Sequence, residues 1–274
     1  IYATGINQEG KGKPIPQPSV FLLPAPPTSR TVTTSAPAEA SEVEQEKHTL
    51  GALRSSISLT LHTFHAARIW RGRAASAGVR PIMGMAGYIS TTNQLKLAAA
   101  ADDPYADWAI LLLEEKIQQA RAALAELTQR LDQPQQRLPG QIHIGDNLNL
   151  HPVTLPLFIG SQMGFLGVYL LTDYDVLARR TLLAHHTALI GQGEMARILD
   201  SGTHLLRGLF AQAQRSKPSG LNRDDFRANH AQAQAASKRL GPLPADILSG
   251  ERRSQYAPSI HLGRSGPIAD PVSG

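Results

Sequence analysis

Apolar residues follow two different periods along the chain. Ile57, Leu59 and Leu61 alternate with polar side chains, which predicts a half-buried strand. After Asp103 and Pro104, which suit a helix start, apolar residues recur every three or four positions until Pro134 and predict one long helix. They form a coiled-coil-type seam of Ile110, Leu113, Ile117, Ala120, Leu124, Leu127 and Leu131. We expect its partner helix in the same chain, with a homodimer through residues 110–131 as the alternative.

Weaker patterns predict the remaining elements. Residues 87–101 favour a helix, whereas residues 141–171 have β character, including an apolar strand at 165–171. Three more helices are predicted at about 172–190, 195–213 and 222–240, and residues 64–70 could be extended or helical. Together these elements predict an α+β fold, in which a small antiparallel sheet packs against a mainly α-helical bundle.

Composition divides the chain into one domain and two arms. Residues 1–47 are rich in Pro, Ser and Thr and predict a disordered arm. Residues 48–249 are expected to form a single α+β domain, followed by a flexible tail at 250–274. No wholly aliphatic run is longer than the five residues 109–113, and no signal sequence is recognised, so we expect a cytoplasmic protein that does not contact membranes.

Motifs for catalysis are missing from the sequence. The chain has no cysteine, which excludes disulfides, thiolate zinc sites and cysteine nucleophiles. The histidine pairs His62/His65 and His185/His186 lack the spacing of a zinc hydrolase, and the glycine-rich run 160–167 lacks the Lys-Ser/Thr ending of a phosphate loop. Pairs of aspartates lie at predicted helix starts, where capping explains them. We therefore predict no enzyme, catalytic residue, metal, cofactor or small-molecule substrate.

The basic residues point to a polyanionic partner. The net charge is +5, and the positive excess lies in residues 51–104 and 176–264. Such a distribution is typical of proteins that bind nucleic-acid phosphates, and Trp70 lies among the arginines of residues 54–80. The last predicted helix is expected to carry its basic side chains on an exposed face. The candidate nucleic-acid-binding residues are Arg54, Arg68, Arg71, Arg73, Arg179, Arg180, Arg223, Arg227, Lys238 and Arg239.

Five stretches carry a resemblance to a known family. In chain order they are LRSSISLTLHT (53–63), IWRGR (69–73), DDPYADW (102–108), LTDYD (171–175) and LSGERR (248–253). Together they resemble the accessory proteins of integrating conjugative elements, a family similar to the AcaB-like transcriptional regulators of mobile plasmids. The resemblance covers about residues 51–260.

The resemblance implies a bacterial protein encoded on mobile DNA that regulates, maintains or transfers its element, with no established catalytic residues. It also implies ribbon-helix-helix DNA binding, in which Ser58, Thr60 and His62 would face the bases of the major groove. The alternative is an assembly factor of the conjugation machinery that binds no DNA. Such a factor would dock through the seam at 110–131 or the acidic segment 105–175.

Overall fold

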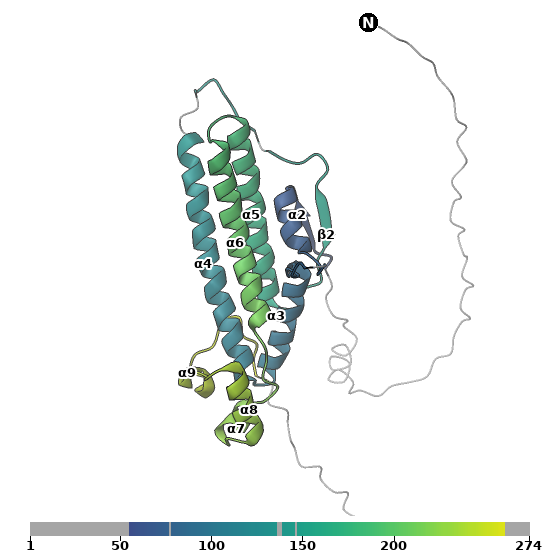
Figure 1. The fold of residues 1–274 in the computed structure, drawn as a ribbon, viewed down its shortest axis with the longest axis vertical. Helices are drawn as coiled ribbons and strands as arrows, with labels where there is room; N and C mark the ends of the chain where they lie inside the picture. The colour runs from purple at the N-terminus through teal and green to yellow at the C-terminus, as the bar shows by residue number, and fades with distance from the viewer. Residues whose placement is uncertain (1–54, 77, 136–138, 146, 261–274) are drawn as a thin grey trace, which may run out of the picture. The chain divides into compact units, whose positions relative to one another are not determined.

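Four long helices form the body of the part of the protein that the structure describes. The computed structural model describes residues 55–260 apart from 77, 136–138 and 146; the predicted arm at 1–47, Arg54 and residues 261–274 lie outside this part. Within it, α3 (Met85–Ala100), α4 (Pro104–Gln135), α5 (Gln162–His186) and α6 (Gln192–Arg215) pack against one another, as Figure 1 shows. The described part is therefore mainly helical, as predicted.

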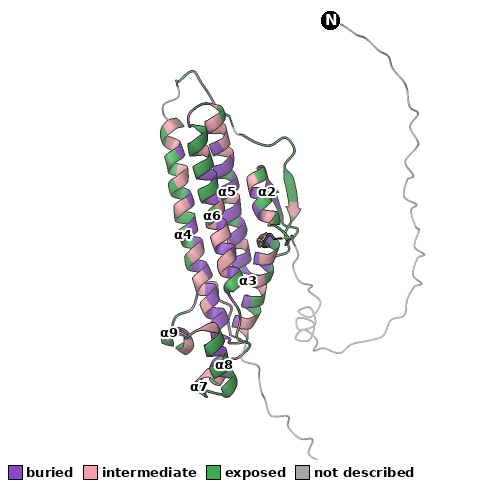
Figure 2. Cartoon of the chain, in the orientation of Figure 1, coloured by how far each residue is buried: buried purple, intermediate pink, exposed green. Residues whose placement is uncertain are grey.

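The predicted seam explains how α4 is packed. Asp103 caps the helix, because its Oδ1 accepts hydrogen bonds from the backbone N–H groups of Tyr105 (2.9 Å) and Ala106 (3.2 Å). The seam residues are buried except Leu127, which is half-buried, and they face α3, α5 and α6 (Figure 2). The partner of the seam is thus in the same chain, as we expected. Because helices of the same chain already cover this face, it does not offer the surface that the alternative homodimer requires.

A two-stranded antiparallel sheet lies beside the helices. Strand β1 (Ser58–Leu61) pairs with β2 (Val153–Pro156), with Leu59 opposite Leu155. The predicted alternation is confirmed within β1, where Leu59 and Leu61 are buried while Ser58 and Thr60 are exposed. The prediction is wrong for Ile57, which lies just before the strand and is exposed. The segment that the sequence left open is helical: α2 (Phe64–Arg71) follows β1 directly and packs against α5, α3 and α6. The sequence prediction of a small sheet packed on a helical bundle is confirmed.

The predicted strand at 165–171 is wrong, because these residues belong to α5. Ser161 caps that helix by accepting a hydrogen bond from the N–H of Gly164 at 3.1 Å, so the helix begins about ten residues before the predicted start. The apolar run at 163–171 is buried on several sides of the helix, so it shows neither a clear helical period nor the usual polar face. None of the described helices is long and apolar enough to cross a membrane.

The C-terminal region is built from short helices. The predicted helix at 222–240 is two helices, α7 (Arg223–Arg227) and α8 (Ala231–Leu240), separated by Asn229 in a left-handed conformation (φ 53°). The predicted cap is confirmed: Asn222 and Asp225 form a reciprocal capping box. A further helix, α9 (Ala245–Ser249), was not predicted and packs against α4 and α7.

Candidate nucleic-acid interface

Helix α2 and the turn after it present two arginines in a fixed arrangement. Ile69 is buried and anchors α2, while Arg68 is exposed. The helix ends at Gly72 (φ +66°), where a Cβ atom would lie 2.5 Å from the backbone of Ile82 and Gly84. This close approach allows Arg73 and Ile82 to exchange two backbone hydrogen bonds of 2.9 and 2.8 Å. Arg73 is therefore held next to α2 rather than on a free loop.

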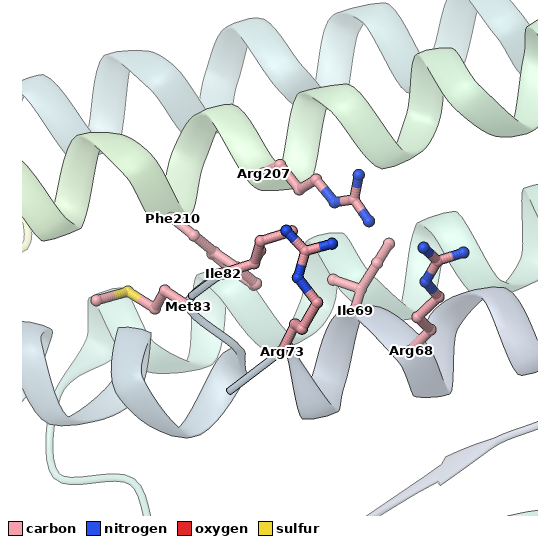
Figure 3. Close-up of a pocket in the computed structure, with 8 residues that line it drawn as sticks. Arg68, Ile69, Arg73, Ile82, Met83, Arg207 and Phe210 are labelled. Carbon is pink, nitrogen blue, oxygen red and sulfur yellow. The ribbon is translucent and has the colours of Figure 1, made fainter. Parts of the chain in front are cut away.

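A third arginine reaches the same place from α6. Arg68, Arg73 and Arg207 line one depression, whose apolar floor includes Ile69, Ile82 and Phe210. Figure 3 shows the three guanidinium groups converging on the space between α2 and α6. We call these three arginines the basic cluster. Arg73 Nη2 also donates a hydrogen bond to the carbonyl oxygen of Arg80 at 3.1 Å.

In the described part of the chain, no carboxylate neutralises the basic cluster. Among the described residues that line the depression, none is Asp or Glu, and none of the three arginines is in an ion pair within that part of the chain. Neighbouring guanidinium groups without a counter-charge repel one another and attract anions. Their planar forks match phosphate oxygens in particular.

Arg71 and the two arginines of α5 lie elsewhere. Arg71 points to a different face of α2 and stacks over the ring of Phe64, with 5.8 Å between the guanidinium carbon and the ring centroid. Arg179 lies with its Nε atom 4.0 Å from Asp175, and Arg180 forms an ion pair with Asp132 of α4. These two α5 side chains therefore each lie beside a carboxylate of the same chain.

The candidates on the C-terminal helices differ from one another. Arg227 is exposed and pairs with Asp224 at 2.8 Å, three residues earlier. Lys238 and Arg239 are exposed in the last turn of α8. They belong to the group of short helices at the end of the bundle where α4 begins, visible at the bottom of Figure 1, away from the label of α2. The candidates thus do not form one continuous surface.

The prediction that Arg223 lies on an exposed face is wrong. Its side chain is 3% exposed and forms ion pairs with Asp102 and, at 2.6 Å, with Asp107. Two of its nitrogens also donate hydrogen bonds to the carbonyl oxygen of Ile247. Both carboxylates are more than a hundred residues away in sequence, so the local pattern around Arg223 gave no sign of its burial.

Asp107 also fastens the segment after α9. Arg253 donates two hydrogen bonds of 2.8 Å to its carboxylate, while Ser254 and Gln255 donate to Glu114, about two turns farther along α4. Residues 253–255 are therefore attached to α4, although they lie in the segment that we expect to be a flexible tail from residue 250.

Asp103, beside this network, is a buried carboxylate with several partners. Burial raises the pKa of Asp103, and hydrogen bonds from the backbone N–H of Gly220 and from the Ser219 side chain oppose this rise. Its Oδ2 accepts from Gly220 at 2.7 Å, while its Oδ1 caps α4. One side chain thus ties the start of α4 to the loop before α7.

A second buried carboxylate fixes the start of α2. Asp175 of α5 accepts hydrogen bonds from the N–H groups of His62 (3.0 Å) and Thr63 (2.9 Å) and from the Thr63 hydroxyl (2.6 Å). Thr63 in turn caps α2 by accepting from the N–H of Ala66. This carboxylate therefore positions the helix that carries Arg68.

Two further expectations concern a DNA-reading ribbon at residues 58–62 and the histidine pairs as metal ligands. In the described residues β1 pairs with β2 of its own chain, so this ribbon is made within one subunit. His62 accepts a hydrogen bond at Nδ1 from the N–H of Asn149 (3.2 Å). In the part of the chain that the structure describes, no three His, Cys, Asp or Glu side chains are grouped as metal ligands would be.

Arg207 lies within the basic stretch 176–264 that the sequence indicates, but it is not among the ten candidate nucleic-acid-binding residues. It is half-buried on α6 beside the buried residues Leu206, Leu209 and Phe210, and the only sign of this in the sequence is an arginine next to an apolar helical stripe. Its convergence with Arg68 and Arg73 depends on packing between helices that are more than a hundred residues apart in sequence.

Comparison with known proteins identifies the family. The family model described as transcriptional regulator AcaB matches residues 49–261. The chain belongs to the AcaB family of transcriptional regulators. Among solved structures, the chain is similar to the crystal structure of selenomethionine-containing AcaB from uropathogenic E. coli, with 10% identity, a TM-score of 0.48, and 72% of this chain and 95% of that chain covered. No curated protein matches it.

The AcaB match confirms the family resemblance given by the five short stretches. Much of what these stretches contribute in the structure is internal support. Thr63, Asp107 and Asp175 make buried contacts that fix α2 and the C-terminal segment, and Gly72 permits the turn that holds Arg73. The residues that resemble the AcaB family therefore mainly hold the basic cluster in position, rather than supply most of its arginines.

Proposed function

We propose that this member of the AcaB family is a non-enzymatic, DNA-associated regulator of an integrative conjugative element in the bacterial cytoplasm. In this proposal the basic cluster of Arg68, Arg73 and Arg207 binds phosphates of the DNA backbone. The observation that carries it is the convergence of three arginines from α2, the following turn and α6 with no carboxylate among the described residues that line the same depression.

Charge and rigidity both favour phosphate binding at the basic cluster. Each phosphate that an arginine neutralises releases condensed counterions, which favours binding at moderate salt. The three side chains come from packed elements, so less conformational freedom is lost than with arginines on a loop. Contacts of this kind hold a protein on the duplex without reading its sequence. Arg71 and Arg80, exposed on the same segment, would add to the positive field.

The test is the salt dependence of DNA binding by a triple variant. In Arg68→Gln/Arg73→Gln/Arg207→Gln, we expect the slope of log affinity against log salt to become shallower by about 2.7, or roughly 0.9 for each lost phosphate contact. At physiological salt the affinity should fall by on the order of tenfold to a hundredfold. Both quantities follow from fluorescence anisotropy of a labelled short duplex between about 50 and 200 mM KCl.

A matched control removes the same charge from other places. Arg130, Arg197 and Arg252 are exposed and lie outside the depression, so their triple replacement by Gln lowers the net charge equally. We expect this control to keep most of the slope and affinity. If both triple variants lost the same slope, or if the unmodified chain ignored duplex DNA, the assignment of the basic cluster would fail.

The assembly-factor alternative has less support. Of its two expected docking surfaces, the seam at 110–131 faces the interior of the bundle. In the acidic segment 105–175, Asp107, Glu114 and Asp175 are buried and hydrogen-bonded within the chain. Among the described residues of these surfaces, no observation favours a partner protein over DNA.

A further inference from the structure

A second hollow lies on another face of α2 from the basic cluster. It is a cavity of about 400 Å³ between α2, the sheet and residues 149–151. This volume is within the range of about 300–1,000 Å³ that is usual for small-molecule sites. Its walls are largely apolar and are formed by Leu61, Phe64, Ala67, Trp70, Val153 and Leu155. A ligand with an apolar body would therefore gain from burial there.

The polar groups of this cavity include one cation and several hydrogen-bond donors. Arg71 lines it, and its Nε donates to the carbonyl oxygen of Ala67 at 3.3 Å, which leaves the two terminal nitrogens to turn toward a ligand. His62 accepts at Nδ1, so the neutral ring carries its proton on Nε2, which can donate. Thr63, Asn149 and His151 complete the polar lining, and none of the described lining residues is acidic.

The polar side of the cavity is preorganised. Asn149 donates from its side chain to the carbonyl oxygen of His62 at 3.0 Å and accepts from the N–H of His151 at 2.9 Å. These bonds fix residues 149–151 to the junction of β1 and α2, which Asp175 holds from the other side. Groups held in this way lose little entropy when a ligand binds.

We propose that this cavity binds a small amphipathic anion, with its carboxylate at Arg71 and the histidines and its apolar body against Trp70 and the sheet. The charge selects an anion, the apolar walls select a body of about ten carbon atoms, and the cavity size excludes a folded partner. In a transcriptional regulator such a ligand would be an effector. This inference does not depend on DNA binding by the basic cluster.

The test is direct binding of two probes to the full chain, decanoate and 1-naphthoate. Calorimetry should give one site with a dissociation constant on the order of 10–100 μM, as expected for ligands of this size. Trp70, one of two tryptophans, lines the cavity, so its fluorescence should change on binding. Arg71→Gln should weaken binding about tenfold, because a charge-assisted hydrogen bond is lost. Ala67→Phe should abolish it by filling the cavity.

Arg197→Gln, an exposed arginine of α6 outside the cavity, is the matched control and should bind both probes normally. Four results would each overturn the proposal. The first is that neither probe binds, and the second is that both cavity variants bind as the unmodified chain does. The third is that uncharged 1-decanol binds as tightly as decanoate, and the fourth is that an oligothymidylate displaces 1-naphthoate.

Discussion

Replacing Asp107 by alanine is expected to lower the free energy of unfolding by about 3–5 kcal/mol. The side chain is fully buried, and its carboxylate pairs with both Arg223 and Arg253. Without it, Arg223 keeps only Asp102 for its charge in a site where it is 3% exposed. A buried cation that has lost a partner is among the costliest defects in a folded protein.

Urea unfolding followed by circular dichroism measures this loss. Asp246→Ala is the control, because Asp246 pairs with Arg252 in an ion pair whose two side chains are 40% and 49% exposed. Exposed pairs contribute about 0–1 kcal/mol, so the control should change stability little. In Asp107→Ala, trypsin should also cleave faster after Arg253, because the segment loses its anchor on α4. A loss below about 1 kcal/mol would show that the network is not structural.

Asp175→Ala is expected to weaken both the fold and DNA binding. Its carboxylate accepts three hydrogen bonds from His62 and Thr63, and the donors would be left without it in a site that is largely buried. Unsatisfied buried donors cost about 1–3 kcal/mol each, so we expect the three donors together to give a loss of at least about 3 kcal/mol. Since the same bonds hold the start of α2, Arg68 and Arg73 should no longer converge with Arg207.

Two measurements on the same protein separate these effects. Urea unfolding reports the stability, and anisotropy with a labelled duplex at low temperature reports the affinity of the molecules that remain folded. Asp173→Ala is the matched control, because Asp173 lies two residues away on α5 with an exposed side chain. It should leave both quantities nearly unchanged. Full DNA affinity in a destabilised Asp175→Ala would show that α2 is positioned without this carboxylate.

The elements that depend on a few neighbouring residues could be predicted from the sequence. The start of α4 at Asp103 and Pro104, the capping box at Asn222, and the alternation in β1 each depend on a few neighbouring residues, and each is present in the structure. The prediction of where α5 begins was wrong for a physical reason. Gly164 and Gly167 lie in its first turns, and glycine is a poor helix former. There the ring of Tyr88 packs where a Cβ of Gly167 would be, so tertiary packing explains the glycine.

The candidate site was harder to predict than the fold. A run of arginines indicated positive charge, but the pairing of each arginine depends on residues distant in sequence. Arg223 meets Asp102 and Asp107, and Arg180 meets Asp132, whereas Arg68 meets no carboxylate in the described part of the chain. Only the packing of α2 against α6 shows which arginines stay free to bind an anion.

The most direct measurement is amide hydrogen exchange of the full chain with and without a saturating short duplex. If the basic cluster is the DNA-binding surface, protection should appear in residues 68–76, 78–83 and 203–210 and be small in α8 and in residues 251–258. Protection confined to α8, or none at all under conditions where the duplex is bound, would contradict the central claim.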